Sequence, residues 1–322
     1  MPELCIGVDV GGTYTKIGVV ERSGRLRLER RLDSQAQQGP AAFVERVCSV
    51  IKAWTSQGVR PVGLGLGIAG DVDSRKGSVR LSPNLPGWAG FDFKRALGRR
   101  LRLPVAVEND ANAAVFGAYV AQLKRKPRHV VGATLGTGLG GGLVIDGRLH
   151  RGATGSAGEL GHTKVQPGGE LCHCGDRGCL EAYAGGYGIL RLARRLALAK
   201  PGQAKRLLSI CGELDALEPV HLTLAAEAGD PVARQTWIKT GQMLAIGLEN
   251  FVLIVNPDVV LILGGVSRAG RWILEPIRRH FARQPFRMPF SRARLALADN
   301  ADAGCVGAAL LALEPEARAD RC

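Results

Sequence analysis

The stretch LCIGVDVGGTYTKIGVV, residues 4–20, places two apolar runs on either side of the glycine pair Gly11-Gly12. The first run is apolar apart from Asp9, and the second alternates between apolar and polar residues. This pattern predicts two strands joined by a tight turn. Ser23-Gly24 predicts a second turn, which leads into a third strand over Arg25–Leu32.

The same plan returns in the middle of the chain. His129–Leu135 reads as a strand, Gly136–Gly142 as a glycine loop, and Leu143–Ile145 as a strand that turns at Asp146-Gly147. A strand, a glycine loop and a second strand therefore occur twice, once near residue 10 and again near residue 138. The duplication predicts an α/β protein with two lobes of similar design.

Helices and buried strands fill the space between these motifs. Apolar residues at helical spacing predict the helices, and short apolar runs bounded by turn residues predict the strands. The helices are expected over Phe43–Trp54, Ala111–Leu123, Ile189–Ala199 and Pro231–Val255 and around Ala308–Leu313, and the strands over Val62–Ile68, Pro104–Val107 and Val259–Leu263.

The length and composition are those of a globular protein. The 322 residues exceed the roughly 100–200 of one domain, and 46% are hydrophobic while 22% are charged. We expect a small lobe over 1–122, completed by a closing helix at about 305–322, and a large lobe over 123–304. A short hinge is expected near 121–128.

The sequence favours a cytoplasmic protein. Its longest apolar stretch, Phe251–Leu263, is broken by Asn256-Pro257-Asp258 and falls short of the roughly 20 residues of a membrane span. The N-terminus enters a strand-like run at once, without the basic and apolar segments of a signal peptide.

The charge points to an anionic ligand. The 43 Lys and Arg residues outnumber the 29 Asp and Glu residues, giving a net charge of +14. The basic residues are spread along the chain among acidic ones, with few aromatic residues for stacking bases. We therefore expect no nucleic-acid partner and a small anionic substrate.

The second glycine loop matches the spacing of one nucleotide-binding motif but lacks its structural context. Gly136–Gly141 has the G-x-G-x-x-G spacing of a dinucleotide site, but a strand and an Asp-Gly turn follow it in place of a helix. The dipeptide Gly-Lys of the P-loop occurs nowhere in the chain. Either glycine loop alone could be a plain tight turn.

Hairpin loops of this kind can nevertheless bind a nucleotide. Successive glycines let backbone N–H groups converge on phosphate oxygens. Asp9 offers a carboxylate for hydrated Mg²⁺, and Lys16 lies close enough in the sequence to meet phosphate charge.

A cluster of cysteines predicts a metal site. The pattern His162-x9-Cys172-x-Cys174-x4-Cys179 supplies one imidazole and three thiolates, the ligands of a closed structural zinc site. His173 lies between two of the cysteines and competes with His162 by spacing alone. Reduced free thiols are the alternative.

These motifs together resemble the ROK family of sugar kinases and sugar-responsive repressors, within the actin/hexokinase/Hsp70 superfamily. The similarity spans Asp9 to about Gly307 and rests on at least five motifs in order, among them Asp9-Val-Gly-Gly-Thr13 with Lys16, the loop over 135–142, the run Gly-Glu-Leu-Gly-His at 158–162, and the cysteine cluster. The resemblance implies two ribonuclease-H-like lobes, with a cleft that closes on ATP and a hexose. It also favours His162 over His173 as the zinc ligand.

The resemblance implies a role for each matching residue. Asp110 matches the catalytic base; by itself it would read as a helix N-cap, where the helix dipole is expected to lower its pKa and keep it ionised. Positions that match the hexose site are Asn84, Asn109, Asp110, Glu159, His162 and Glu181. The nucleotide site is expected to contain Asp9, Gly11, Gly12, Thr13, Lys16, Gly136, Thr137 and Gly138, with Gly264 and Gly265 near the adenine.

The resulting hypothesis is an enzyme of carbohydrate metabolism that phosphorylates an aldohexose, most simply glucose, at its 6-hydroxyl with Mg-ATP. The alternatives are a kinase for N-acetylmannosamine, N-acetylglucosamine, fructose or mannose, and a sugar-sensing protein without activity. Family repressors carry a DNA-binding segment before the first phosphate motif, and only eight residues precede Asp9. The resemblance also suggests a homodimer or homotetramer.

Overall fold

The computed structural model describes residues 3–82, 84–298 and 301–314, and the chain forms two compact units. The first unit comprises Met1–Lys126, Gly142–Gly158 and Asn300–Cys322, and the second comprises Pro127–Gly141 and Glu159–Asp299. The lobe boundaries expected from the sequence stay a prediction. Residues 315–322 of the expected closing helix lie outside the described residues.

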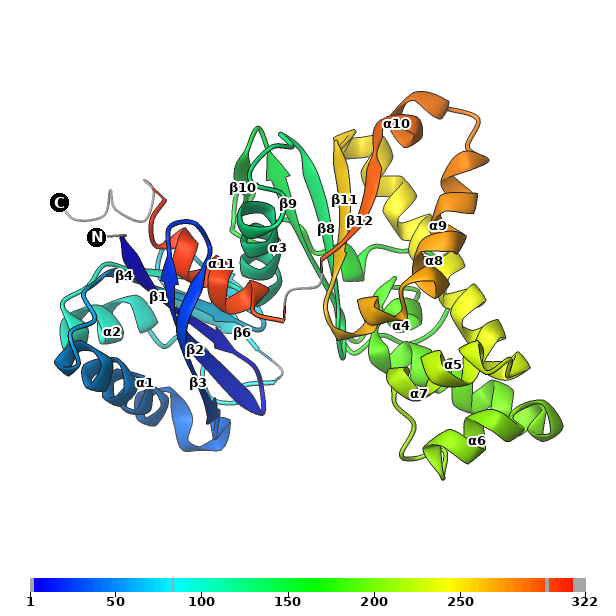
Figure 1. Cartoon of the computed structure of the whole chain (residues 1–322), viewed down its shortest axis with the longest axis horizontal. Coiled ribbons are helices and arrows are strands. Elements are labelled where there is room, and N and C mark those ends of the chain that lie inside the picture. Colours follow the sequence, from blue (N-terminus) through cyan, green and yellow to red (C-terminus); the bar gives the residue numbers. More distant parts are fainter. Residues whose placement is uncertain (1–2, 83, 299–300, 315–322) are drawn as a thin grey trace. The chain divides into compact units, whose positions relative to one another are not determined.

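The first unit is built on a five-stranded sheet with the order β3-β2-β1-β4-β7 (Figure 1). Strands β1, β4 and β7 are parallel, whereas β2 and β3 form an antiparallel meander at one edge. The elements of this unit are β1 Leu4–Val10, β2 Tyr14–Glu21, β3 Leu26–Asp33, the 3₁₀ helix η1 Ala36–Gln38, α1 Gly39–Ser56, β4 Pro61–Ile68, β5 Asp71–Asp73, β6 Ser78–Leu81, α2 Phe93–Leu101, β7 Val105–Asn109, α3 Asp110–Ala121, β10 Arg148–His150 and α11 Ala303–Leu311.

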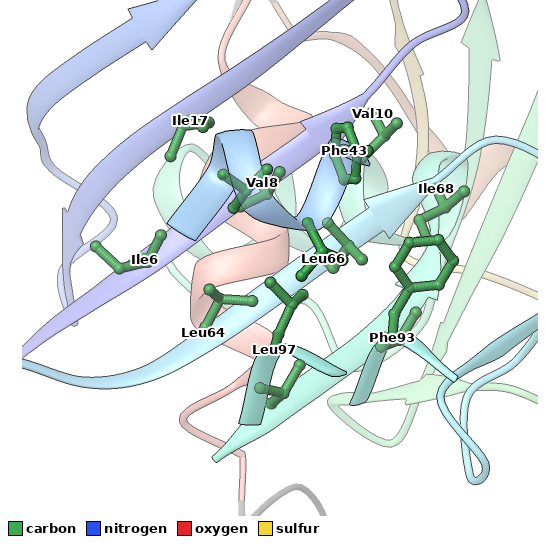
Figure 2. Close-up of a cluster of buried hydrophobic side chains, with 14 of the residues drawn as sticks. Ile6, Val8, Val10, Ile17, Phe43, Leu64, Leu66, Ile68, Phe93 and Leu97 are labelled. Atoms are coloured by element: carbon green, nitrogen blue, oxygen red, sulfur yellow. The ribbon is translucent and has the colours of Figure 1, made fainter. Parts of the chain in front are cut away.

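One face of this sheet carries large apolar side chains. Because successive residues of a strand point to opposite faces, the sequence PVGLGLGI of β4 sends Leu64, Leu66 and Ile68 to one side. They are fully buried against Phe43 of α1 and Phe93 of α2 (Figure 2). The remaining labelled members of the cluster in Figure 2 are Ile6, Val8, Val10, Ile17 and Leu97.

The opposite face carries glycine and receives the last helix of the chain. Helix α11, red in Figure 1, lies against β1, the blue strand from the other end of the sequence. A Cβ on Gly65 would lie 1.6 Å from the carbonyl oxygen of Ala308, and one on Gly7 would lie 1.9 Å from that of Cys305. The helix backbone therefore rests directly on the sheet, which no larger residue at these positions would permit.

Helices α3 and α11 also approach at backbone distance. A Cβ on Gly307 would lie 1.7 Å from the carbonyl oxygen of Ala113, and one on Gly117 would lie 2.2 Å from that of Ala303. Small residues at the crossing thus bring the two helices together and fix the position of α3, whose first residue is Asp110.

The second unit repeats the design. A second sheet, whose strands β8, β11 and β12 belong to this unit, has the order β10-β9-β8-β11-β12, so numbering the strands within each sheet gives 3-2-1-4-5 in both cases. The division between the units passes through β9. The elements are β8 Val130–Leu135, β9 Leu139–Ile145, η2 Leu160–His162, α4 Glu181–Ala184, α5 Gly186–Ala199, η3 Pro201–Gln203, α6 Lys205–Cys211, α7 Pro219–Glu227, α8 Pro231–Val255, β11 Val259–Leu263, η4 Gly265–Ala269, α9 Arg271–Ala282, α10 Arg287–Arg292 and β12 Arg294–Leu297.

The duplicated plan read from the sequence is confirmed, but two details of it are wrong. The second glycine loop covers only three residues, because Gly140–Gly142 already belong to β9. The cap of α3 is Asn109, whose side chain accepts a hydrogen bond from the Asn112 N–H, and Asp110 is the first helical residue. Glycines inside a strand hide its beginning from a pattern search, because they carry no side chain to alternate.

Helix α8 is long and apolar enough to cross a membrane by length and composition alone. Its sequence contains no long uncharged run, because Arg234, Lys239 and Glu249 interrupt it. Its side chains from Val232 to Val252 include many fully buried ones, and the core helix of a soluble protein passes the same test. The helix is weak support for a membrane span, and a cytoplasmic location stays a prediction.

The contact between α3 and α11 predicts the effect of one added methyl group. Gly307→Ala should lower the free energy of unfolding by about 3 kcal/mol, because the new Cβ overlaps a backbone oxygen that cannot move without its helix. Gly98→Ala in α2 is the matched control, since its Cβ would meet nothing closer than 3.5 Å. Urea unfolding of the three proteins measures the difference, and equal stability of the two variants would contradict the packing.

Candidate active site

The candidate site of the first unit lies where its parallel strands end. Val10 of β1 pairs with Ile68 of β4, which pairs with Asn109 of β7, so the three strands finish level with one another. The carboxyl edge of parallel strands is where α/β proteins usually bind ligands. The turn at Gly11-Gly12 and the residue Asp110 follow these strand ends directly.

Hydrogen bonds fix the conformation of the first glycine turn. The Gly11 N–H donates to the Tyr14 carbonyl over 3.0 Å, which closes the turn. The Ser34 hydroxyl donates to the Gly11 carbonyl over 2.7 Å, and the Ser34 N–H donates to the Thr13 carbonyl over 2.8 Å. Both carbonyls are thus tied to Ser34, while Gly12 and Thr13 stay exposed. The exposed segment can present its N–H groups to an anion.

Asn84 lies beside this turn. A Cβ on Gly12 would be 3.5 Å from the Cβ of Asn84, which is exposed. The loop that carries Asn84 is anchored by Trp88, whose buried ring packs on Phe43 and whose indole N–H donates to the Ala36 carbonyl over 3.0 Å. The aromatic anchor fixes a polar side chain next to the glycine turn.

The carboxyl of Asp9 is partly buried and packs closely against helix α11. A Cβ on Gly304 of α11 would lie 2.4 Å from an oxygen of the Asp9 carboxyl, so only glycine leaves room for it. Burial raises the pKa of Asp9 to about 7, with the Asp110 carboxylate raising it and Lys16 lowering it. A carboxyl that is this poorly solvated gains strongly from a cation.

Lys16 lies opposite Asp9 in the antiparallel pair of β1 and β2. Its ammonium group forms an ion pair with Asp302, the residue before α11, and lies 3.7 Å from Glu29. The structure thus surrounds Lys16 with acidic groups, in contrast to the simple phosphate contact expected from its position in the sequence.

The pKa of Asp110 is raised, whereas its position at a helix start predicts a lowered pKa. Burial raises the pKa, and the N–H groups of Ala111 and of Asp110 itself lower it by less. The expectation of a lowered pKa was therefore wrong, because two N–H groups at a helix start do not compensate for the loss of water. A raised pKa suits a group that must accept a proton near neutral pH.

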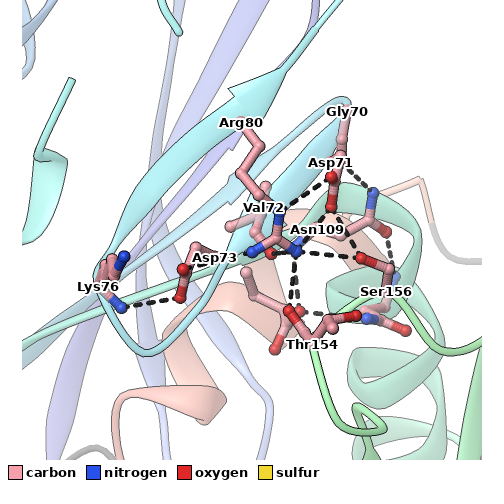
Figure 3. Close-up of polar contacts among 11 residues, drawn as sticks. Gly70, Asp71, Val72, Asp73, Lys76, Arg80, Asn109, Thr154 and Ser156 are labelled. Atoms are coloured by element: carbon pink, nitrogen blue, oxygen red, sulfur yellow. Dashed lines mark hydrogen bonds and ion pairs between the residues drawn. The ribbon is translucent and has the colours of Figure 1, made fainter. Parts of the chain in front are cut away.

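Asn109 connects Asp110 with a polar cluster that the sequence search missed (Figure 3). Its amide donates to the Gly70 carbonyl over 3.0 Å and to Asp110 Oδ1 over 3.2 Å. Beside it, Arg80 makes a two-pronged ion pair with Asp71 over 2.8 and 2.9 Å. A polar network of this kind holds a loop in one geometry.

The same arginine reaches a second loop. It donates to the Thr154 carbonyl over 2.8 Å and to the Ser156 hydroxyl over 3.0 Å, and Ser156 in turn donates to Asp71. Arg80 also lies 3.3 Å from Asp73 (Figure 3). The hairpin of β5 and β6 is thereby joined to the loop after β10. No sequence motif indicates this, because the partners lie more than seventy residues apart.

The second unit contains a cluster that could hold a metal ion. One ligand atom each from His162, Cys172, Cys174 and Cys179 lies within 4.8 Å of the others. The Nδ1 atom of His162 is 3.8 Å from Cys172 Sγ, which leaves Nε2 as its other nitrogen. His173, the competing histidine, stacks its ring on Tyr187 at a centroid distance of 3.7 Å.

Tight turns form this cysteine knuckle. The Gly175 N–H donates to the Cys172 carbonyl over 3.0 Å, and the Cys172 N–H donates to the Asp176 carbonyl over 2.8 Å. Gly178 has a positive φ, and a Cβ there would lie 1.9 Å from the Gln166 carbonyl. Lys164 donates to Cys179 Sγ over 3.0 Å.

Glu181 joins the knuckle to the second glycine loop. Its Oε2 accepts the Leu139 N–H over 2.9 Å, and a Cβ on Gly138 would lie 2.4 Å from the same oxygen. Its Oε1 lies 3.4 Å from both Cys172 Sγ and the Tyr187 hydroxyl. The glycine is therefore needed for the approach of the carboxylate as much as for the turn.

The remaining predicted residues of this unit lie on two neighbouring strand ends and on η2. Gly136 and Thr137 follow β8, and their carbonyls accept the N–H groups of Gly186 and Tyr187 at the start of α5. Gly264 follows β11 at a φ of 96° and packs on Leu135 at the end of β8. The other two residues are Gly265, which begins η4, and Glu159, which is the N-cap of η2.

Comparison with known proteins identifies the family of this chain and the class of its fold. The ROK family model matches residues 5–315, and the chain belongs to the ROK family. It therefore has the actin-like ATPase fold, and each of its sheets is the core of one such lobe.

Relatives include sugar kinases across almost the full length. A glucokinase from Streptomyces coelicolor is 37% identical over 317 residues, covering 97% of this chain and 98% of the relative. An N-acetylmannosamine kinase from Escherichia coli O157:H7 is 31% identical over 309 residues, covering 95% and 97%. The crystal structure of a ROK family glucokinase from Streptomyces griseus, in complex with glucose and AMPPNP, has a TM-score of 0.83 at 38% identity and covers 96% of this chain and 98% of its own.

The raised pKa of Asp9 predicts a pH dependence of stability in the absence of Mg²⁺ and nucleotide. An unfolded Asp titrates near 4, so between about pH 4 and 7 the folded protein binds the extra proton and loses stability as the pH rises. Asp9→Asn removes this loss. Between pH 5 and 8 its free energy of unfolding should rise relative to that of the wild type by about 2–3 kcal/mol.

Asp73→Asn is the contrasting control. The Lys76 N–H lowers the pKa of Asp73, so this variant should lose stability relative to the wild type as the pH rises from acid toward neutral. Urea unfolding at several pH values measures both. Parallel pH profiles of the wild type and Asp9→Asn would contradict the raised pKa.

Proposed function

We propose that this protein is a glucokinase, which transfers the γ-phosphoryl group of ATP to the 6-hydroxyl of glucose. The observation that carries the proposal is the carboxyl of Asp110, which is partly buried at the carboxyl edge of the first sheet and hydrogen-bonded by Asn109. The near full-length similarity to glucokinases, one of them crystallised with glucose and AMPPNP, supports the choice of sugar and nucleotide.

Asp110 is proposed as the base. It orients the 6-hydroxyl, whose oxygen attacks the γ-phosphorus while the bond to the β–γ bridging oxygen breaks and ADP leaves. The hydroxyl proton passes to Asp110. Because phosphoryl transfer has a loose transition state, orientation of the hydroxyl and a late proton transfer suffice.

The remaining first-unit residues are assigned to the sugar and the phosphates. Asn84 and Asn109 bind sugar hydroxyls, and the exposed N–H groups of Gly12 and Thr13 bind phosphate oxygens. Asp9 would hold Mg²⁺, which neutralises charge on the phosphates when bound. The residues of this unit in the proposed nucleotide site are Asp9, Gly11, Gly12, Thr13 and Lys16.

The second unit is proposed to bind the same two substrates. The carboxylates of Glu159 and Glu181 accept hydrogen bonds from sugar hydroxyls, and the imidazole N–H of His162 donates one to a sugar hydroxyl. The turns at 136–138 and 264–265 bind the nucleotide, with the second near the adenine.

The cysteine knuckle is proposed to hold structural Zn²⁺. Three thiolates and one imidazole form a closed tetrahedral set, and the four ligand atoms already lie within reach of one ion. A His162 that coordinates through Nδ1 would keep its Nε2–H for a sugar hydroxyl. The zinc would thereby fix the orientation of a sugar ligand.

A kinase for an N-acetylated hexose is the second candidate. The similarity to the N-acetylmannosamine kinase, at 31% identity, favours it over fructose or mannose as the alternative. The mechanism would be the same, since the two sugars differ at the 2-position and share the primary 6-hydroxyl.

A sugar panel tests the function. With Mg-ATP, ADP release should depend on added glucose and exceed release with N-acetylmannosamine, N-acetylglucosamine, fructose or mannose. Asp110→Asn should retain sugar binding and lose about 10²–10⁴-fold in kcat, because the amide cannot take the proton. Faster turnover on an N-acetylated sugar would move the assignment to the second candidate, and sugar binding without turnover would indicate a sensor.

Metal analysis tests the knuckle. The purified protein should contain about one equivalent of zinc, and Cys179→Ser should lower both the zinc content and the affinity for glucose. Cys211→Ser, which changes a buried cysteine outside the cluster, should leave both unchanged. Full glucose affinity in zinc-free protein would contradict a link between the metal and the sugar site.

A further inference from the structure

Glu108 is a buried carboxylate near the end of strand β7. It is the fourth residue of β7, VAVEN, and only 2% of its surface is exposed. Its Oε1 accepts the backbone N–H of Asn109 over 3.0 Å and the side-chain amide of Asn112 over 3.1 Å. A charge in such a place is costly unless several partners engage it.

Arg151 supplies the opposite charge from another part of the first unit. Its Nε donates to Glu108 Oε2 over 2.6 Å, and a quarter of its side chain is exposed. The arginine follows β10, in the same loop whose Thr154 and Ser156 bind Arg80. Loop and strand are therefore joined by a short, largely dehydrated ion pair.

The contacts of Glu108 lead to Asp110 through Asn109. Glu108 Oε1 accepts the backbone N–H of Asn109 and the side-chain amide of Asn112. The backbone N–H of Asn112 in turn donates to Asn109 Oδ1 over 3.0 Å. The other end of the Asn109 amide donates to Asp110. Both ends of the Asn109 side chain are thereby fixed in a network that the Glu108 carboxylate anchors.

We infer that Glu108 and Arg151 are positioning residues for phosphoryl transfer, which set the orientation of Asn109 and Asp110 without touching the substrate. This inference rests on the proposed function, because it assigns the pair an effect on the base. A displacement of about 1 Å at a reacting group can cost on the order of 10²-fold in rate, so a rigid turn before Asp110 would preserve the rate of phosphoryl transfer.

A purely structural ion pair is the competing explanation, and the first unit offers a matched example. Glu21 at the end of β2 is also buried, with 9% exposed, and is paired with Arg27. It lies on the meander side of the sheet, where its carboxylate accepts hydrogen bonds from Arg27 and Ser23. Removal of its charge should affect stability without affecting turnover.

The experiment is a double-mutant cycle of Glu108→Gln and Arg151→Gln, with Glu21→Gln as the control. In Glu108→Gln one carboxamide faces donors on both sides, from Asn109 and from Arg151, and can accept from one side only. We expect kcat with glucose to fall about 10–100-fold, while the glucose dissociation constant changes less than about threefold. Thermal unfolding of each variant establishes that it is folded.

The double variant should recover activity. The new carboxamide at position 151 can accept an N–H from the new carboxamide at position 108, which turns the oxygen of the latter back toward Asn109. The kcat of the double variant should therefore exceed that of Glu108→Gln by at least about fivefold, a coupling that independent sites do not show. Glu21→Gln should keep the kcat of the wild type.

Two results would overturn the inference while leaving the proposed function intact: a wild-type kcat in folded Glu108→Gln, or additive losses in the double variant. Absence of turnover by the wild-type protein on every sugar would instead refute the proposed function, and this inference with it.

Discussion

The direct packing of helix α11 on the glycine face of the first sheet is the contact on which the rest of this unit depends. Gly65 and Gly7 let the helix backbone touch the strands, and Gly307 lets α3 touch α11. Because Gly304 is in the same helix, the packing also brings the N-terminal end of α11 onto the Asp9 carboxyl. A rigid scaffold thereby places helix ends next to strand ends.

The candidate chemistry follows from charges that this packing dehydrates. Burial raises the pKa of both Asp9 and Asp110, and both residues lie at the carboxyl edge of the first sheet. Glu108 is more fully buried than either and is engaged by Arg151 and by two amide groups. One carboxylate of the first unit is thus neutralised by the protein itself, whereas the other two are left to interact with ligands.

In the second unit, one short segment serves two purposes. The knuckle gathers three thiols and His162, and the helix that begins immediately after it starts with Glu181. Glu181 contacts both Cys172 and the N–H of Leu139, so the metal cluster and the second glycine loop share a carboxylate. A change in the knuckle should therefore reach the glycine loop through a single side chain.

The duplicated plan, the strands, the cysteine cluster and the family could all be read from the sequence, because each is local: a period of two, a glycine pair or a fixed ligand spacing. Sequence reasoning also singled out Asp110, although it gave the wrong direction for the pKa, since the degree of burial depends on elements distant in the chain. The folded chain was needed to show that Lys16 meets Asp302, that Arg80 binds the loop after β10 and that Arg151 neutralises Glu108. These partners lie between 43 and 286 residues apart, and no local pattern encodes which distant side chain will compensate a buried charge.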